Sequence, residues 1–170
     1  MDRLGATPET TGSLWAAATW LESILEHGSL GAVWPLTDET LREELVADWV
    51  DVNARHPTIV ARDHESIIED LSSLLPPRDP QLWRGFEEAQ VRDFRAMWGD
   101  VDLRSWSWEK EPKPLALDVE TIVVLDAGEL DDDGRPVTAP PSEGLPGLGF
   151  VMRYSDRAWR VMAVTPCLCY

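Results

Sequence analysis

The sequence predicts an α+β protein in which N-terminal helices pack on one face of a curved antiparallel sheet. Three observations predict this fold class. Apolar residues recur about every 3.6 positions through the first hundred residues, the period falls to about 2 after Gly99, and the last two strands are close enough in sequence to form a hairpin. Helices that precede strands in this way are typical of α+β domains. We therefore expect one domain over residues 1–170, with residues 1–12 as a loose N-terminus.

Two helices are expected in the first part of the chain. The first covers residues 13–27, and Gly28 follows it as a C-cap. The second begins at Thr37, whose hydroxyl can accept a hydrogen bond from the backbone N–H of Thr40. Apolar residues at helical spacing predict the buried face of this second helix, namely Leu41, Leu45, Trp49 and Val52.

Two further helices are expected before Gly99. Asp63 caps the third helix, whose apolar residues are Ile67, Ile68, Leu71, Leu74 and Leu75, and which must stop before Pro76. Asp79 caps the fourth helix, and Pro80 occupies its first position, where a missing N–H costs nothing. One side of this helix is predicted to carry Leu82, Trp83, Phe86, Phe94 and Met97.

The second half of the chain is predicted to form the sheet. Residues 104–110 and 115–126 alternate as strands, and residues 128–147 form a solvated loop rich in Gly, Pro and Asp. A hairpin follows over residues 148–154 and 159–165, with Asp156 and Arg157 in its turn. The expected pairs on its core face are Tyr154 with Trp159, Met152 with Val161, and Phe150 with Ala163.

The other face of this sheet suggests an assembly. In this register Asp118 and Glu120 share a face with the facing pair Arg153 and Arg160, as a structural ion ladder. The rest of that face carries an apolar strip that needs covering, formed by Ile122, Val124, Val151 and Met162. We therefore expect a homodimer through the sheet.

The hairpin sequence GFVMRYSDRAWRVMAV, residues 149–164, resembles the closing hairpin of the NTF2-like (SnoaL-like, cystatin-like cone) superfamily. The match lies in the turn residues Asp156 and Arg157 and in Trp159, Arg160 and Val161. The resemblance implies a cone-shaped fold with an open pocket, which members use as isomerases, dehydratases, carriers or non-catalytic modules. It carries over no catalytic residue, because the family's catalytic positions match no numbered residue of this chain.

Composition excludes several classes of protein. The 170 residues include 31 Asp and Glu against 15 Lys and Arg, a net charge of -16 with no basic stripe, so we expect neither nucleic-acid nor membrane binding. The two cysteines, Cys167 and Cys169, lie too near each other in sequence for a disulfide between them to close a stabilising loop. The lack of a disulfide framework fits a cytoplasmic protein. The spacing of His56 and His64 predicts no metal site, and the absence of phosphate-binding, dinucleotide-binding and nucleophile-elbow motifs predicts no cofactor.

Tryptophan is the most unusual feature of the composition, with nine residues against two tyrosines and three phenylalanines. Indole rings bury a large area and still offer an N–H, which suits a pocket for a flat ligand. The candidate ligand-binding residues are Trp34, Trp49, Trp106, Trp108 and Tyr154. The alternative is that these rings fill an ordinary core between helices and sheet.

Three functions are compatible with these observations. The first is non-catalytic binding of a small apolar or aromatic ligand, or of a protein partner. The second is a small isomerase, dehydratase or cyclase with a carboxylate general base in the cone, which requires an acid whose pKa is moved toward neutrality. The third is an acidic protein that masks a basic surface on another macromolecule. We expect the first, because no acid–base pair stands out from the 31 carboxylates.

Overall fold

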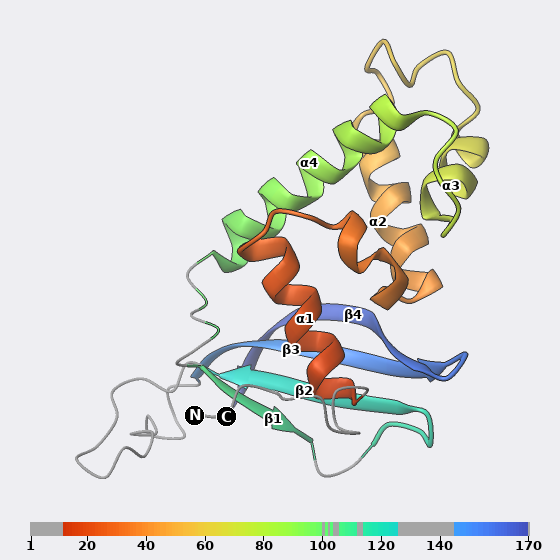
Figure 1. The fold of residues 1–170 in the computed structure, drawn as a ribbon. Coiled ribbons are helices and arrows are strands. Elements are labelled where there is room, and N and C mark those ends of the chain that lie inside the picture. The colour runs from red at the N-terminus through yellow and green to blue at the C-terminus, as the bar shows by residue number, and fades with distance from the viewer. Residues whose placement is uncertain are drawn as a thin grey trace, which may run out of the picture. The chain divides into compact units, whose positions relative to one another are not determined.

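The computed structural model describes residues 12–99, 101, 103, 106–111, 114–125 and 145–169 (Figure 1). The described part of the chain is α+β, with four α-helices and one 3-10 helix preceding a four-stranded antiparallel sheet. It divides into two compact units, which we call the sheet unit (Met1–Thr19 with Asp100–Tyr170) and the helical unit (Trp20–Gly99). The predicted N-terminal segment 1–11 and most of the predicted loop, 126–144, lie outside the described residues.

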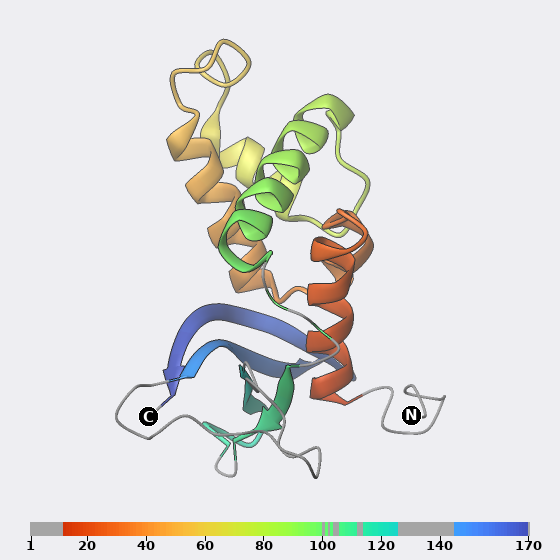
Figure 2. The same ribbon diagram turned by 90° about the vertical axis from the view of Figure 1, so that its left-hand side faces the viewer.

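The helical unit holds the end of α1 (Ser13–Leu25), the 3-10 helix η2 (Gly31–Leu36), α2 (Glu39–Val52), α3 (His64–Ser72) and α4 (Pro80–Trp98). Figure 2 shows α2 and α4 side by side within this unit. Apolar side chains from all five helices are buried and form its core, including Trp20, Ile24, Val33, Val46, Leu71 and Phe86. Burial of this apolar surface is the main driving force that holds the helices together.

The helix ends follow the capping residues of the sequence, with one exception. Gly28 has a φ of 66°, the left-handed conformation expected of the C-cap position after α1. The predicted cap of α2 at Thr37 is wrong, because its hydroxyl donates to the Val33 carbonyl and accepts from the Trp20 indole N–H, both at 2.9 Å. Asp38 caps α2 instead, accepting the backbone N–H of Thr40 at 3.1 Å.

The caps of the later helices are confirmed. Asp63 accepts the backbone N–H of Ser66 at the start of α3. Asp79 accepts the N–H groups of Gln81 and Leu82, each at 3.1 Å, and Pro80 begins α4. These carboxylates accept hydrogen bonds from backbone N–H groups that have no partner within the helix. Their negative charge also interacts favourably with the positive end of the helix dipole.

The buried face of α2 differs from the prediction. Leu41 is buried as expected, but Val46 and Val50 are also buried, whereas Val52 is 85% exposed. Arg42 lies on the buried face, where its guanidinium donates to the carbonyls of Thr37 and Ser72, each at 2.6 Å. A charged side chain can be buried when its donors are bonded in this way, so the buried face of α2 includes the position of Arg42.

Some apolar residues of α3 and α4 are also more exposed than expected. α3 ends at Ser72, and the following Leu74 and Leu75 are exposed rather than packed in a helical stripe. On α4, Leu82, Phe86 and Phe94 are buried, but Met97 is 60% exposed. The exposed positions line two hollows of the helical unit that are described below.

The sheet has the strand order β1-β2-β3-β4, with β1 (Ser107–Lys110), β2 (Val119–Leu125), β3 (Leu145–Ser155) and β4 (Ala158–Cys169). Trp106 precedes β1, so the first predicted strand is shorter than expected. The first predicted residues of β2, 115–118, form a turn that returns to Val119. β3 begins at Leu145, so the last residues of the predicted loop belong to a strand. The sheet is not strongly curled, which differs from the cone that the resemblance implies.

The hairpin forms at the predicted turn, where Asp156 and Arg157 have φ values of 49° and 66°. Two positive φ values are typical of the tight turns that match the twist of a hairpin. Tyr154 pairs with Trp159 and Met152 with Val161, as predicted. The third pair is wrong, because a bulge between Val151 and Met152 leaves Met162 unpaired and places Phe150 opposite Val164.

The prediction that the apolar strip for dimerisation lies on one surface of the sheet is wrong. Ile122 pairs with Phe150 and Val124 with Leu148, and all four side chains are buried. Val151 lies on the opposite face of β3, since side chains alternate along a strand.

The predicted ion ladder is wrong as well. Val119 faces Arg153, whereas Glu120 faces Met152. A register that differs by one residue moves every side chain of β2 to the other face. Arg153 and Arg160 do face each other across β3 and β4, as expected.

Candidate functional site

The helical unit contains a hollow of about 740 Å³ between α2 and α4, which we call the groove. Its α2 side is formed by Leu45, Asp48, Trp49 and Val52, and the segment after α2 adds Asn53, His56, Thr58, Ile59 and Arg62. The α4 side is formed by Asp79, Gln81, Leu82, Gly85, Ala89, Gln90, Arg92, Asp93, Phe94 and Met97. Every lining residue therefore belongs to the helical unit.

The α2 wall consists of one stripe of that helix. Leu45, Asp48, Trp49 and Val52 follow the spacing of residues on one face. Three of them are apolar residues that the sequence predicts to be buried, and their position on the groove explains why that prediction fails. Val52 is 85% exposed, so the stripe meets an open hollow instead of another element.

Small residues on α4 leave space opposite this stripe. Gly85 lies in the interior of α4, and a Cβ atom built there would lie 3.8 Å from Cζ2 of Trp49. Ala89 stands one turn further along the helix, and Met97 extends the wall with a side chain that is 60% exposed. Exposed apolar side chains on both sides of a hollow are typical of binding sites.

Trp49 is supported from behind by an aromatic cluster. Its ring meets the buried Phe86 edge-on, with ring centroids 5.7 Å apart. Phe86 also contacts Trp34 at 5.7 Å and Trp83 at 5.5 Å. Within the described part of the chain, the Trp49 indole N–H has no hydrogen-bond acceptor, so it is a donor that a ligand can use.

The charged side chains of the groove are mostly paired. Arg62 Nη1 lies 2.8 Å from Asp79 Oδ2, and Arg92 Nε lies 3.0 Å from Asp93 Oδ1. His56 Nδ1 lies 2.7 Å from the Thr58 hydroxyl oxygen. The exposed carboxylate of Asp48 has no ion pair or hydrogen bond with any residue that the structure describes. The groove therefore carries one uncompensated negative charge on its α2 wall.

Asp79 is held in its ionised form. The hydrogen bond from Arg62 is the largest cause that lowers the pKa of this carboxyl below its ordinary value. The backbone N–H groups of Leu82 and Gln81 lower the pKa further, and burial opposes them. A carboxylate that accepts several hydrogen bonds is a poor proton acceptor near neutrality. Its contacts fit a structural role at the start of α4.

A second hollow of about 280 Å³ lies in the same unit. It is lined mainly by apolar residues, among them Trp34, Pro35, Leu74, Leu75, Pro76 and Trp83. Trp34 is 5% exposed, and its indole N–H donates to the Leu71 carbonyl at 3.2 Å. The N–H of Trp34 is thus occupied within the protein, unlike that of Trp49.

The five predicted ligand-binding residues are divided between the two units. Trp34 and Trp49 both contact Phe86 in the helical unit. Trp106, Trp108 and Tyr154 belong to the sheet unit and line neither hollow. There Trp108 stacks on Phe150 with centroids 5.9 Å apart, and Tyr154 meets Trp159 at 5.3 Å.

In the sheet unit, the carboxyl of Glu120 has several partners. Glu120 Oε2 lies 2.8 Å from Lys110 Nζ and accepts the Ser13 hydroxyl at 2.5 Å, so the start of α1 contacts β2. Burial raises the pKa of Glu120, but the hydrogen bonds from Lys110 and Ser13 outweigh it, and the pKa lies below its ordinary value. This carboxyl also stays ionised near neutrality.

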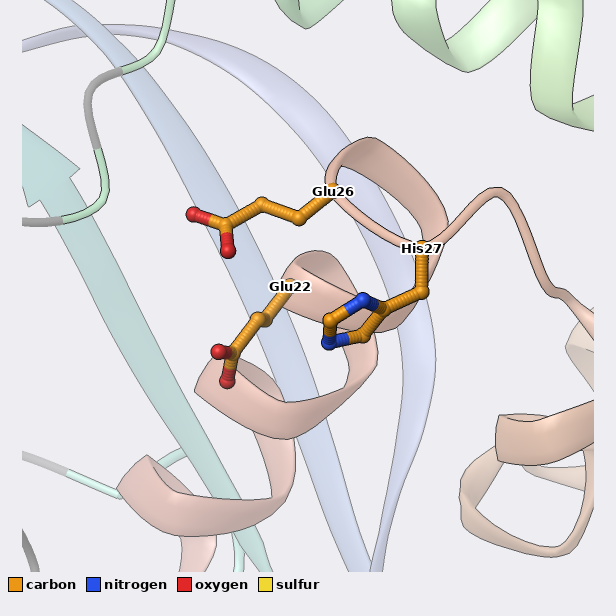
Figure 3. A group of neighbouring side chains, drawn as sticks. All are labelled: Glu22, Glu26 and His27. Carbon is orange, nitrogen blue, oxygen red and sulfur yellow. The ribbon is translucent and has the colours of Figure 1, made fainter.

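A third group of side chains lies at the end of α1 (Figure 3). Glu22, Glu26 and His27 are exposed, and their potential ligand atoms lie within 4.8 Å of one another. A histidine at the C-terminal end of a helix can interact favourably with the negative end of the helix dipole. This interaction is a structural reason for a histidine at position 27. The three exposed side chains do not by themselves identify a metal site.

The sequence missed Gly85 and Ala89 of the groove, and it left open whether Asp48 faces a cavity or solvent. Gly85 could have been recognised from the sequence, because a glycine inside a helical pattern weakens the helix and often marks a place where packing requires a small residue. Nothing in the sequence distinguishes Asp48 from the other carboxylates.

No described helix is both long and apolar enough to span a membrane. No family model, curated protein or solved structure matches this chain.

Proposed function

We propose that this protein is a non-catalytic binding protein whose groove takes a small molecule with an apolar or aromatic body. The observation that carries the proposal is the accessible apolar surface on both walls, formed by the half-buried Trp49 and the exposed Val52 and Met97. The volume of about 740 Å³ lies within the usual range of small-molecule pockets, about 300–1,000 Å³. The supported ring of Trp49 offers a flat contact and a free N–H donor.

Binding is favoured over catalysis by the lowered pKa values of two carboxyl groups, Asp79 and Glu120. A general base of the isomerase or dehydratase type needs a pKa raised toward neutrality. The pKa of Asp79, which lines the groove, is instead lowered by Arg62 and by backbone N–H groups. The carboxyl of Glu120 is held in the same direction by Lys110 and Ser13.

A distant NTF2-like relationship is a separate part of the proposal. It is supported by the order of helices and strands and by the hairpin with Asp156 and Arg157 in its turn. The proposed ligand site does not depend on this relationship, because every residue that lines the groove belongs to the helical unit.

We also keep homodimerisation through the sheet as a proposal, on a different face from the one first expected. Ile122 and Val124 are buried, so the candidate face is the opposite one, where Val151 neighbours Thr121 and Ala163. Sedimentation of the wild-type protein and of Val151→Glu tests it. A wild-type dimer that becomes a monomer is expected, and a wild-type monomer at micromolar concentration contradicts it.

Naphthylethanol, a neutral aromatic probe, tests the ligand-binding proposal. Titration followed by NMR should give saturable shifts of the Trp49 indole N–H and of the Val52 and Ala89 amides. Gly85→Leu places a larger side chain in the groove and should weaken binding by about tenfold, equal to about 1.4 kcal/mol. Arg84→Leu adds the same side chain to α4 one residue away, outside the groove, and should bind as the wild type does.

A second variant that narrows the groove keeps the proposal testable if Gly85→Leu does not fold. Ala89→Leu also narrows the groove and should weaken binding in a folded protein. The proposal fails if none of the groove resonances shifts up to millimolar probe, or if Gly85→Leu and Ala89→Leu, both folded, bind as tightly as Arg84→Leu.

A further inference from the structure

The charge of the groove identifies a narrower class of ligand. This inference rests on the proposed function: we propose that the groove binds an organic cation, in which an ammonium or guanidinium group is carried on an apolar or aromatic body. The cationic group would pair with Asp48, and the body would lie on Trp49, Val52 and Met97.

The ion pairs among the residues that line the groove favour a cationic ligand. Asp79 and Asp93 already have arginine partners, at 2.8 and 3.0 Å, so the charges of these four side chains compensate one another. His56 is bonded to Thr58. Asp48 is the remaining carboxylate of the groove and has no described partner. A cation that pairs with Asp48 therefore makes a new interaction without disrupting an existing one.

The rest of α2, outside the groove, adds to this negative potential. Besides Asp48, α2 carries four exposed carboxylates that have no described ion pair: Glu39, Glu43, Glu44 and Asp51. Arg42 is the single basic residue of the helix, and its guanidinium is buried against backbone carbonyls. A net charge of -16 strengthens the attraction of cations and the repulsion of anions.

The neighbouring aromatic ring provides a second recognition element. Asp48 and Trp49 are adjacent in sequence and line the same hollow. A cation held near an indole face gains from the ring quadrupole in addition to its ion pair. Val52 and Met97 offer apolar contacts to the rest of the molecule. The size of the groove fits a small molecule, so we assign it to a small cation rather than to a protein segment.

Three probes with the same aromatic body test the inference: naphthylethylammonium, naphthylethanol and naphthylpropanoate. NMR titrations at pH 7 and low salt should show the ammonium binding at least about fivefold more tightly than the alcohol, with the carboxylate weakest. Asp48→Asn should remove the advantage of the ammonium and leave the alcohol unchanged. Asp51→Asn removes the same charge from an exposed position of α2 outside the groove, and should reduce the advantage by less than about twofold.

The outcomes separate this inference from the proposed function. If the alcohol binds in the groove and the ammonium binds no more tightly, the inference is wrong and the proposed function stands. If Asp48→Asn and Asp51→Asn reduce ammonium binding equally, the preference arises from the overall charge, and the assignment to Asp48 is wrong. If no probe shifts the groove resonances, the proposed function fails together with the inference.

Discussion

Trp49 meets Phe86 edge-on, with ring centroids 5.7 Å apart and ring planes inclined by 72°. Aromatic pairs in this arrangement contribute about 0.5–1.5 kcal/mol beyond the area that they bury. Phe86 is fully buried and is packed in turn against Trp34 and Trp83. The ring that lines the groove is therefore positioned by the core of the helical unit before any ligand arrives, which reduces the entropy that binding must offset.

Gly85→Ala should raise the free energy of unfolding by about 0.8–1 kcal/mol, because Gly85 is exposed in the interior of α4 and alanine favours the helix. The added Cβ would lie 3.8 Å from Trp49, an ordinary contact. Gly28→Ala is the matched control and should lower the free energy by about 1 kcal/mol, since φ is 66° there. Urea unfolding measures both, and a change of the same sign in the two variants would contradict the argument.

Asp79→Ala should lower the free energy of unfolding by about 1 kcal/mol at pH 7, because α4 loses its cap and Arg62 loses its partner. The pKa of Asp79 is lowered in the folded protein, so this stabilisation is present above its ordinary pKa of 3.8 and is lost as the pH falls through the folded value. The difference between wild type and variant in urea unfolding should therefore shrink between pH 5 and pH 2. Asp63→Ala, which removes the cap of α3, controls for the loss of a cap alone. A difference that is constant over this pH range would refute the role of the ionised carboxyl.

Lys110→Met should raise the pKa of Glu120 above its ordinary value of 4.5. Burial is the largest influence on the pKa of this carboxyl and raises it, and without Lys110 only the Ser13 hydroxyl opposes that effect. NMR titration of the Glu120 carboxyl carbon measures the pKa directly. Ser13→Ala should shift the pKa in the same direction by a smaller amount, because the salt bridge to Lys110 remains. A pKa that stays below 4.5 in Lys110→Met would show that burial is not the dominant influence.

Arg157→Gly should raise the free energy of unfolding by about 0.5–1 kcal/mol. The φ of 66° at this position is costly for arginine and natural for glycine. Thermal unfolding measures the effect, and a higher Tm is expected. Ala158→Gly is the control, because Ala158 begins β4 and gains nothing from the freedom of glycine, so its Tm should fall. If both variants lower the Tm, the turn does not strain Arg157.

The sequence determined the local structure where one residue acts on its near neighbours. Asp63 and Asp79 cap their helices as predicted, because a side-chain carboxylate reaches only backbone N–H groups two or three residues away. The turn at Asp156 and Arg157 follows for a similar reason, since a short connection between two alternating segments forces a hairpin.

The tertiary structure decided which faces are buried and where the site lies. The face of α2 that carries Arg42 is buried, and the Arg42 guanidinium donates hydrogen bonds to the carbonyls of Ser72 and Thr37. The stripe of α2 that carries Trp49 and Val52 lines the groove instead. In the sheet, the unpaired Met162 shifted the register of the hairpin by one residue beyond the pair Met152–Val161. Neither outcome follows from periodicity, because an amphipathic pattern specifies an apolar stripe but not the element that covers it, and a single bulge reverses the alternation of a strand.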